Sequence, residues 1–595
     1  MRTILFTTAA LAALAALPAR AETPVEEVIV TATRLPTDPV VITGAHVIDR
    51  TEIEARNVTF ATDLLSTIPG VAVARTGAFG GTAAIRIRGA SPDKTLVLVD
   101  GVPVDDPSDP NGAYDPSLLQ TQDLERIEVL SGPQSSLWGS DAIGGVVSFT
   151  TRELDGVRVA AEGGSFKTAR GFAGVGRATD RYAVSADVAG FRTDGISKAD
   201  TGAEKDGFKT ATANLAGRVT LSDTVKLDGR LRYAYADADT DGFAPPTFAL
   251  GDTPDRYKTR TWQGAARATV DAFGLTHQFS VNAYEIHRSS ISSFPSLFDA
   301  DRQVYRWTAA HGQDFEVGVE RQRTSADLSS GNSLNLSNTA VFAVGRLKLD
   351  RLTLTGSARY DDPDKYQSRA TGRLAAAVDL GRGFTAVASA GTGFKTPTIS
   401  EAVCDFCFAP AVPLRPEKAE GYDLRLGWAS DRISAAVTAY RLSVRDQIAY
   451  VSLRYVNIAR TRSNGVDAEL TATLSDELKL KLAYAYLDAV DRSTGRSLLR
   501  VPDHSGSAAL FWNHGPWEGA VTVRGESSQS DTARDGFSRA VRPGFVTADV
   551  SGAYAVTANL SLTARVENLT DKRFEEVLGY REPGIAAYVG VRFRN

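Results

Sequence analysis

Residues 225–235 read VKLDGRLRYAY, and this stretch decides the fold that we expect. One set of alternate positions is apolar or aromatic: Val225, Leu227, Leu231, Tyr233 and Tyr235. The positions between them carry charge: Lys226, Asp228, Arg230 and Arg232. Side chains on a β-strand alternate between its two faces, so this segment has one apolar and one charged face. Residues 478–486, LKLKLAYAY, repeat the pattern.

Soluble β-sandwiches also alternate in this way, and the ends of the strands distinguish them from a membrane barrel. The apolar faces end in paired tyrosines, as at the aromatic girdle of a transmembrane barrel. Near-copies of one short turn precede the two strands, LSDTVKL at 221–227 and LSDELKL at 474–480. The linkers that follow, 236–260 and 487–503, are longer and rich in Asp and Gly. Short turns at one end and long loops at the other favour a barrel.

From residue 153 to residue 595 the chain repeats this alternation. At roughly 20 residues for each strand and its share of connection, that length gives on the order of 22 strands. A bilayer accepts only helices or closed barrels, because every backbone polar group needs a partner there. A barrel of that size has a wide lumen that must be filled. The sequence therefore predicts a transmembrane antiparallel β-barrel over 153–595 with another domain inside it.

Residues 37–152 have a different texture and supply that domain. Two short helices are expected, in DRTEIEARN (49–57) and ATDLLSTIPG (61–70). Four strand-like runs follow: AAIRIRG (83–89), TLVLVDGVPV (95–104), LERIEVLSGP (124–133) and GGVVSFTT (144–151). A mixed α+β domain of this length can hold a small core of its own.

The first 36 residues are expected to stay outside both domains. Residues 1–21 have a positive start, an apolar run and small residues at the end, which is typical of a secretory signal peptide. The segment 22–36 then contains the β-prone run EEVIVTATR (26–34), with no neighbouring strand to pair with. An unpaired strand is normally a liability. We interpret this run as a handle for another protein; the alternative is a frayed N-terminus.

The remaining composition excludes several classes of function. The net charge is −5 with both signs interspersed, and no basic block suggests nucleic acid. Cys404 and Cys407 lie in AVCDFCFAP, where a small loop disulfide suits an exported chain. A zinc site would need about four ligands, and a thioredoxin-like redox motif would need a βαβ setting. No G-x-S-x-G elbow or P-loop is present, so we expect no enzyme.

A family resemblance rests on the order of several motifs. EEVIVTATR, LLSTIPGV, IRIRGA, TLVLVDGVPV and LERIEVLSGPQSSLWGSDAIGGVVSFTT resemble the plug of TonB-dependent outer-membrane receptors. GTGFKTPTISE, LRPEKAEGYDLRL, YVNIARTRSNGVDAEL and the last 30 or so residues resemble its barrel segments. The resemblance covers essentially the whole mature chain. It implies a monomeric active transporter in the bacterial outer membrane, with a plug at 37–152 and outer-membrane lipid around the barrel.

The resemblance also implies a cargo and an energy-coupling partner. The motif GSDAIGGVV, the modest length and two acidic loops look most like the cobalamin (vitamin B12) receptor, while ferric catecholate siderophore receptors share most plug signatures. Haem or carbohydrate cargo is less favoured, as is a non-transporting adhesin or enzyme barrel. A TonB-type periplasmic protein would capture the handle by adding it to a sheet edge. That TonB box comprises Glu27, Val28, Ile29, Val30, Thr31, Ala32 and Thr33.

Two arginines on the plug are candidates for a releasable ionic latch. Arg86 and Arg88 share one face of IRIRGA and must find carboxylates inside the barrel, because an unpaired buried charge is costly. Glu420 and Glu567 are candidate partners; ordinary plug–wall adhesion is the alternative. The family often has arginine before the Gly-Pro of LSGPQ, where this chain has Ser131, and this departure puts one expected buried charge pair in doubt.

Acidic residues in two loops are candidates for a calcium site. Calcium takes six to eight oxygen ligands, and clustered carboxylates repel one another without a cation. The resemblance to cobalamin receptors places the ligands at Asp194, Glu204, Asp206, Asp241 and Asp255. Solvated acidic loops without a metal are the alternative.

Cargo contacts are expected at two outward apices of the plug, RTGAFGGTAA (75–84) and VDDPSDPNGAYDPS (104–117). Gly-, Pro- and Asp-rich loops on a rigid scaffold are common recognition elements. Phe79 and Tyr114 offer flat apolar area to a macrocycle. The full set of candidates is Arg75, Phe79, Asp106, Tyr114 and Asp115.

Overall fold

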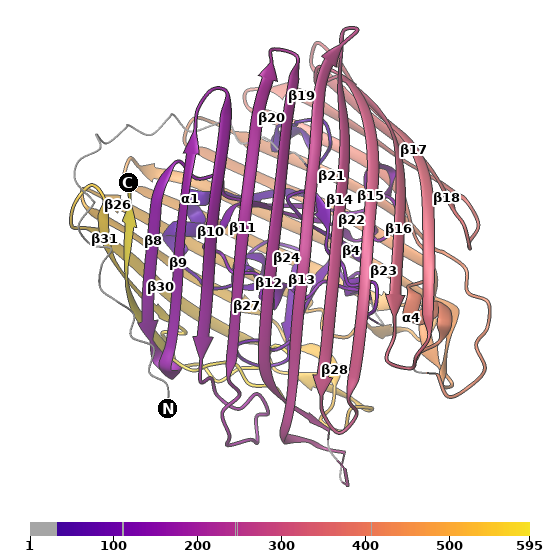
Figure 1. Cartoon of the computed structure of the whole chain (residues 1–595), viewed down its shortest axis with the longest axis vertical. Coiled ribbons are helices and arrows are strands. Elements are labelled where there is room, and N and C mark those ends of the chain that lie inside the picture. Colours follow the sequence, from indigo (N-terminus) through magenta and orange to yellow (C-terminus); the bar gives the residue numbers. More distant parts are fainter. Residues whose placement is uncertain (1–31, 110–111, 244, 247, 406) are drawn as a thin grey trace.

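The computed structural model describes residues 32–595, except residues 110, 111, 244, 247 and 406. Its main feature is a 22-stranded closed antiparallel β-barrel that surrounds an N-terminal plug domain (Figure 1). The barrel closes because the last strand, β32 (Ala586–Arg594), pairs antiparallel with the first, β8 (Gly156–Gly164). Closure leaves no strand edge exposed. The predicted fold class is therefore confirmed.

The other barrel strands follow one another around the wall in chain order. They are β9 (Thr168–Ala178), β10 (Tyr182–Thr193), β11 (Phe208–Ser222), β12 (Val225–Phe243), β13 (Leu250–Ala272), β14 (Leu275–Ile291), β15 (Ser296–His311), β16 (Phe315–Asp327), β17 (Ser333–Leu349), β18 (Leu352–Pro363), β19 (Arg369–Gly381), β20 (Phe384–Lys395), β21 (Glu417–Ala429), β22 (Ile433–Val451), β23 (Arg454–Ser475), β24 (Leu478–Asp491), β26 (His504–His514), β27 (Trp517–Glu526), β30 (Phe545–Ala555) and β31 (Leu560–Glu567). Three short strands lie in loops: β25 (Arg496–Ser497), β28 (Gln529–Thr532) and β29 (Arg539–Arg542).

The connections at the two ends of the barrel differ, as the sequence predicts. At one end only two to four residues separate successive strands, for example between Ser222 and Val225. At the other end, which we call the outer end, the longest connection runs from Lys395 to Glu417 and carries α4 (Ile399–Val403). One expectation is wrong: 236–260 is mostly strand rather than loop, because β12 and β13 stay paired as far as Phe243 and Leu250. The hydrogen-bonded pairing of β12 with β13 continues beyond the part of the strands that carries the exposed apolar side chains.

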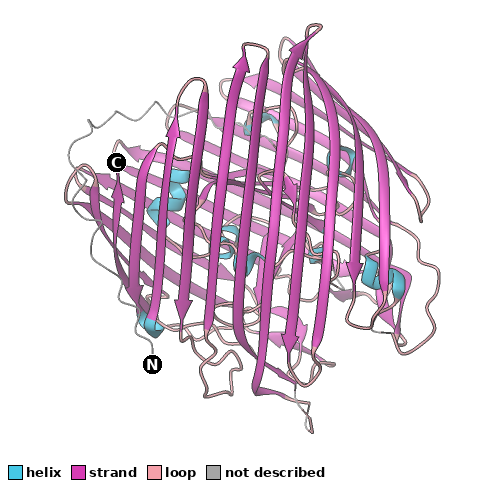
Figure 2. Ribbon diagram, in the orientation of Figure 1, coloured by secondary structure: helices cyan, strands magenta, loops and turns pink. Residues whose placement is uncertain are grey.

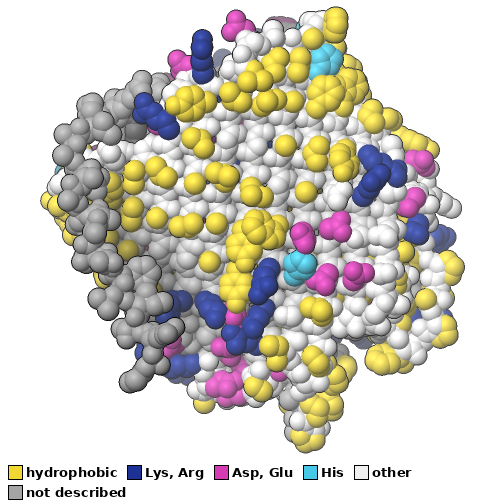
Figure 3. All heavy atoms as spheres, in the orientation of Figure 1, with side chains coloured by type: hydrophobic (Ala, Val, Ile, Leu, Met, Phe, Trp, Pro, Cys, Tyr) yellow, Lys and Arg dark blue, Asp and Glu magenta, His cyan; other side chains and the backbone are white. Residues whose placement is uncertain are grey.

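The outside of the barrel carries the apolar faces. Leu227 and Leu231 are exposed, whereas Arg232 on the same strand is buried toward the lumen. Figure 3 shows rows of hydrophobic side chains across the middle of one face, where charged side chains are sparse. No helix in the described part of the chain is long and apolar enough to cross a membrane. An apolar outer surface of this kind is typical of transmembrane barrels, whose strands face lipid.

The plug is a small sheet with short helices packed around it (Figure 2). The sheet has the order β1-β6-β7-β4-β5, in which only β4 and β7 pair in parallel. Its strands are β1 (Ala45–Ile48), β4 (Thr95–Val99), β5 (Val102–Pro103), β6 (Leu124–Ser131) and β7 (Gly145–Thr151). The helices are α1 (Arg50–Arg56), α2 (Ala61–Leu65) and α3 (Ser135–Trp138), with 3₁₀ turns at Pro39–Val41, Pro92–Lys94, Pro116–Leu118 and, in the barrel, Ser165–Lys167.

Both predicted plug helices are present, and the four predicted strand runs form strands. One difference concerns IRIRGA, because β3 (Ala83–Ile87) does not join the main sheet but pairs with β2 (Val71–Arg75) as a separate hairpin. The main core joins both parts: Ile85 and Ile87 are buried with Val97, Val129 and other residues of the sheet. The apex loops of the plug are thereby held on a rigid base that faces the outer end.

Candidate functional site

Three of the candidate contact residues border one cavity. It holds about 360 Å³ and lies between the plug apices and strands β12–β14 of the wall. Asp106, Tyr114 and Asp115 line its plug side, and Tyr284 and Arg288 line its wall side. The cavity thus combines aromatic rings with a guanidinium whose charge is balanced by Asp106 and Asp109, so what it offers a ligand is flat rings and hydrogen-bond donors.

The carboxylates at this cavity are engaged within the protein. Asp115 accepts hydrogen bonds from the backbone N–H of Ser117 and of Ala83, each at 3.0 Å. Asp106 accepts a 2.8 Å bond from the N–H of Ser108 and lies 3.3 Å from Arg288 Nε. These contacts hold the shape of the apex loops, and burial raises the pKa of the Asp115 carboxyl. Both residues therefore shape the cavity.

Arg288 retains unused hydrogen-bonding capacity. Its Nη1 donates to Asp109 at 3.0 Å, and the guanidinium lies 4.7 Å from the ring centroid of Phe298. Its Nη2 is buried and has no hydrogen-bond partner among the described residues. A buried donor without a partner is costly. The sequence pattern did not single out this residue, although its even position on β14 places it with Tyr284 on the lumen face.

The other two candidate contact residues lie elsewhere. Arg75 pairs with Asp63 at 3.1 Å and with Glu582 at 3.0 Å, so its charge is already balanced. Phe79 packs in an aromatic cluster, 5.6 Å from the Phe166 ring centroid and 6.0 Å from that of Phe191. Both residues fasten the apex 75–84 to the surrounding wall and loops, and neither borders the cavity beside Arg288.

Arg88, one of the two predicted latch residues, reaches the barrel wall. It is 2 % exposed and pairs with Asp423 of β21, while its guanidinium lies 4.1 Å from the Tyr440 ring centroid. Arg86 forms no ion pair within the described residues, and burial lowers its pKa to about 10. The two arginines therefore differ, and only Arg88 has the contacts of an ionic latch.

Neither predicted partner meets these arginines. Glu420 lies on the outer face of β21, where it pairs with Arg445 at 3.4 Å, while Glu567 pairs with Arg565 within the wall. Glu420 and Asp423 are three residues apart and so point to opposite faces of the strand. The alternation in the sequence could have predicted this position of Glu420, because Glu420 shares a strand face with the exposed side chains of Tyr422 and Leu424.

Gly132, the residue after Ser131, leaves room for the Arg88 guanidinium. Ser131 is fully buried, and the next residue, Gly132, has φ +85°. A Cβ at Gly132 would lie 2.8 Å from Arg88 Nη1, so a side chain there would collide with the guanidinium. Although this chain lacks the arginine that the family often has at position 131, a plug–wall ion pair is still made close by, through Arg88.

Several plug–wall ion pairs were not foreseen from the sequence. Lys94 pairs with Glu417 at 2.8 Å, Lys395 with Asp141 at 3.0 Å, and His46 with Glu469 at 2.7 Å. Further pairs join Asp100 to Arg230, Asp123 to Arg232, Asp105 to Arg302 and Glu52 to Lys481. The plug is held on many sides by charge as well as by packing.

The predicted handle lies mostly outside the described residues, which begin at Ala32. The Ala32 N–H donates to Glu128 Oε2 at 2.9 Å, and Trp138 Nε1 donates to the Ala32 carbonyl at 2.8 Å. Thr33 follows, and the Arg34 guanidinium lies 4.4 Å from the ring centroid of Trp138. The chain is therefore fixed to the plug at the end of the handle, from Ala32 onward. Glu27, Val28, Ile29, Val30 and Thr31 are not described.

Three of the five predicted calcium ligands come together. One carboxylate oxygen of each of Glu204, Asp206 and Asp241 lies within 4.8 Å of the others. Asp194 instead pairs with Lys167 at 2.9 Å, and Asp255 stays outside the group. The buried Lys198 donates through Nζ to the Asp239 carbonyl, beside the group. Burial raises the pKa of Asp206 to about 7 and lowers that of Lys198 to about 8.

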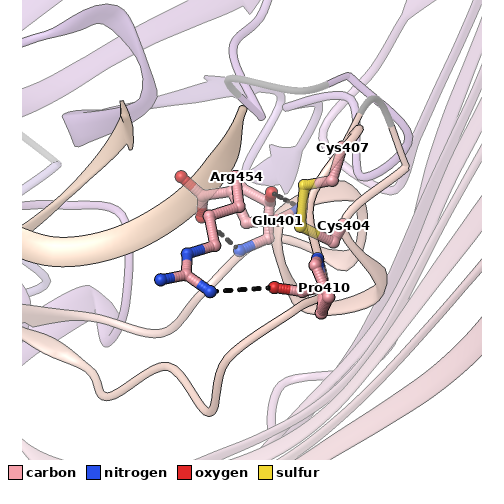
Figure 4. The surroundings of a disulfide bond; sticks show 6 residues. Glu401, Cys404, Cys407, Pro410 and Arg454 are labelled. Carbon is pink, nitrogen blue, oxygen red and sulfur yellow. Dashed lines mark hydrogen bonds between the residues drawn. A yellow bond between two sulfur atoms is a disulfide. The ribbon is translucent and has the colours of Figure 1, made fainter. Parts of the chain in front are cut away.

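The two cysteines are bonded to each other in the long connection before β21. Figure 4 shows the bond between Cys404 and Cys407 just after α4. Cys407 N–H donates to the Cys404 carbonyl at 3.0 Å, and Arg454 of the neighbouring β23 donates to the Pro410 carbonyl at 3.4 Å. The bond closes a tight turn at the outer end of the barrel.

Comparison with known families identifies this architecture. Residues 149–569 match the family described as TonB dependent receptor-like, beta-barrel, and residues 41–146 match the TonB-dependent receptor plug domain. The chain belongs to the TonB-dependent receptors. A plugged barrel of this kind, with an apolar outer surface, places this receptor in the bacterial outer membrane. The family consists of receptors and transporters.

Solved structures of similar fold include several siderophore receptors. The siderophore receptor PirA from Acinetobacter baumannii has a TM-score of 0.82 and 16 % identity, covering 96 % of this receptor and 100 % of PirA. A point mutant of the ferric enterobactin receptor PfeA from Pseudomonas aeruginosa has a TM-score of 0.80 and 18 % identity, and the match covers 96 % of this receptor and 100 % of PfeA. The ferric-catecholate import receptor Fiu from E. coli K12 has a TM-score of 0.76 and 16 % identity, and the match covers 94 % of this receptor and 98 % of Fiu.

Proposed function

We propose that this receptor imports a ferric siderophore of the catecholate type. Two of the structures similar to it in fold are receptors for ferric enterobactin or ferric catecholates. The cavity chemistry supports the same class, because a ferric catecholate presents flat aromatic rings around an anionic centre. The three structures named above are siderophore receptors, so they favour this class over cobalamin, the cargo that the sequence pattern first suggested.

The observation that carries the proposal is the unused donor of Arg288. Nη2 of this arginine is buried beside the cavity and lacks a partner among the described residues, and Tyr114 and Tyr284 flank the same space. A charge-assisted hydrogen bond from Nη2 to a catecholate oxygen would satisfy this donor. The tyrosine rings would pack against the catechol rings at offset-stacking distance.

Energy for the transport step would come from a TonB-type protein in the periplasm. The handle at 27–33 is the proposed attachment point, used by β-augmentation. Because Ala32 is fixed to Glu128 and Trp138, a pull on the handle acts directly on the plug. The outer membrane has no nucleotide supply, so mechanical coupling through such a segment provides the work.

Cobalamin remains a second candidate, favoured by the group of Glu204, Asp206 and Asp241. The donor set fits calcium, a hard cation that prefers carboxylate oxygens. Part of the bonding capacity of these carboxylates is already used within the protein. Asp206 accepts a hydrogen bond from Lys198 N–H at 2.6 Å, and Asp241 accepts one from Thr253 N–H at 3.1 Å. We propose that bound calcium would tie the loop that holds Glu204 and Asp206 to the outer end of β12.

One binding experiment tests both candidates. Purified receptor in detergent would be titrated with ferric enterobactin and with cyanocobalamin, each with and without calcium. We expect ferric enterobactin to bind, and Arg288→Gln to weaken it by about tenfold, equivalent to about 1.4 kcal/mol for a lost charged hydrogen bond. Arg218→Gln, at the periplasmic end of β11, is the matched control. Calcium-dependent binding of cyanocobalamin alone would overturn the siderophore assignment.

A further inference from the structure

Two cavities lie in line along one side of the plug. The outer one, about 100 Å³, borders Asp549 and Ser551 of β30 and Glu567 at the outer end of β31. The inner one, about 50 Å³, borders Thr563 of β31 and Arg592 of β32. Because β31 runs from the periplasmic end at Leu560 to the outer end at Glu567, the cavities follow each other along the wall. Together they form an interrupted passage.

The interruption is the short connection between α1 and α2. Asn57 borders the inner cavity, while Val58 and Thr59 border the outer one. Asn57 ends α1 in the left-handed conformation, with φ 48°. The connection 57–59 therefore closes the passage with three residues of plug backbone.

The wall holds this connection with hydrogen bonds to neutral groups. Arg170 Nη1 donates to the Val58 carbonyl at 3.1 Å, and its Nη2 donates to Asn57 Oδ1 at 2.9 Å. Arg565 Nη2 donates to Thr59 Oγ1 at 3.0 Å.

The charged partner of both arginines lies on the wall itself. Glu162 of β8 accepts from Arg170 at 3.3 Å and from Arg565 at 2.8 Å. If the connection 57–59 moved away, Arg170, Glu162 and Arg565 would remain paired with one another. Opening at this point leaves no charge without its partner.

Other sides of the plug would open at greater cost. Separation there would break buried ion pairs such as Arg88–Asp423, Lys94–Glu417 and Lys395–Asp141. Within the described residues, no ion pair joins the plug to β26, β27, β30 or β31; contacts there are hydrogen bonds such as Ser551 Oγ to the Ala55 carbonyl at 2.6 Å. This sector of the wall borders the outer cavity, where Arg75 of the plug is paired with the loop after β31 through Glu582 and not with the strands themselves.

The inner cavity has an excess of positive charge. Arg50 and Arg152 of the plug and Arg158 and Arg592 of the wall all contact the single carboxylate of Glu54, at 2.7–3.4 Å. Burial and the neighbouring arginines lower the pKa of Arg152 to about 9. Such a chamber attracts anions.

We propose that the transport path of this receptor runs through these two cavities, and that the connection 57–59 is its gate. Cargo would leave the apex, pass the hydroxyl-lined outer cavity and be drawn past 57–59 into the arginine-lined inner cavity. The inference rests on the receptor being a transporter and not on which cargo it carries. Asn57 and Thr59 are positioning residues that hold the gate shut.

A leak measurement tests the gate without any cargo. Thr59→Ala and Asn57→Ala remove gate contacts but leave the charges of the wall paired. The probe is nitrocefin, whose hydrolysis by a periplasmic β-lactamase reports entry into cells that lack the energy-coupling protein. We expect several-fold faster entry for the double variant. The control, Ser136→Ala, removes a 2.7 Å hydrogen bond to Ser357 on another part of the wall and should behave as wild type.

A second measurement locates the leak on one side of the plug. In the leaky variant with Cys404 and Cys407 replaced by serine, Ala55→Cys with Ser551→Cys would tether α1 to β30, and Ser136→Cys with Ser357→Cys would tether α3 to β18. We expect the first disulfide to stop nitrocefin entry until reductant is added, and the second to have no effect. Absence of a leak, suppression by the second tether, or no suppression by the first would overturn the proposal.

Discussion

At the residue scale, the receptor is organised by charges whose partners lie on a different domain. Arg88 and Asp423 are far apart in the sequence and almost fully buried in the structure. Sequence reasoning could foresee that Arg88 needs a carboxylate, because a buried charge must be paired. It could not foresee Asp423, because the rotation of the plug inside the barrel is set by packing that no local pattern records.

Replacement of Arg88 by glutamine should destabilise the plug–barrel assembly by up to about 3–5 kcal/mol, because it leaves the buried Asp423 with Arg373, 3.8 Å away, as its remaining cationic partner. The double variant Arg88→Met with Asp423→Leu should recover much of that loss. The measurement is thermal unfolding in detergent, analysed as a double-mutant cycle. Arg445→Gln breaks the exposed Arg445–Glu420 pair and is the control that should change little. If Arg88→Gln and Arg445→Gln lowered the unfolding temperature equally, this account of the Arg88 pair would be contradicted.

At the element scale, the sequence predicted strands well and loop limits poorly. The period of two in 225–235 places Leu231 outside and Arg232 inside, as observed. The same period does not say where a strand leaves the bilayer, so 236–260 was expected to be loop although the ladder continues through it. The acidic candidates were predicted only in part, because Asp194 pairs with Lys167 instead and Asp255 stays outside the group of Glu204, Asp206 and Asp241.

The handle is the element whose role can be tested most directly. Ile29→Pro should abolish energy-dependent uptake of ferric enterobactin, because proline removes a backbone donor from any strand added at a sheet edge. Binding of the same cargo to the purified receptor should be unchanged, since the proposed role of the handle is energy coupling and not contact with the cargo. Thr23→Pro, placed before the handle, serves as the control. Normal uptake by the Ile29 variant would contradict the role of 27–33.

At the scale of the whole molecule, the barrel and the plug are each complete as hydrogen-bonded units. The barrel ladder closes through β8 and β32 without any plug strand, and the plug sheet contains no barrel strand. Both architectures follow from local sequence patterns, and this explains why the sequence sufficed to predict them. The cavities and the gate depend on how one unit sits inside the other, and this arrangement is recorded only in three dimensions.

The wall charges that the plug now pairs predict how an emptied barrel would conduct. Cations exceed anions by one among these partners: Arg158, Arg230, Arg232, Arg288, Arg302, Lys395, Lys481 and Arg592 against Glu316, Glu320, Glu417, Asp423, Glu469, Glu576 and Glu582. Deletion of 32–152 would hydrate these groups and leave a small positive excess in the lumen, so the pore should prefer anions weakly. A reversal potential measured in a planar bilayer across a potassium chloride gradient gives the sign. Arg230→Gln with Arg232→Gln should reduce the preference, whereas cation selectivity of the emptied barrel would show that the lumen is not lined as the structure places it.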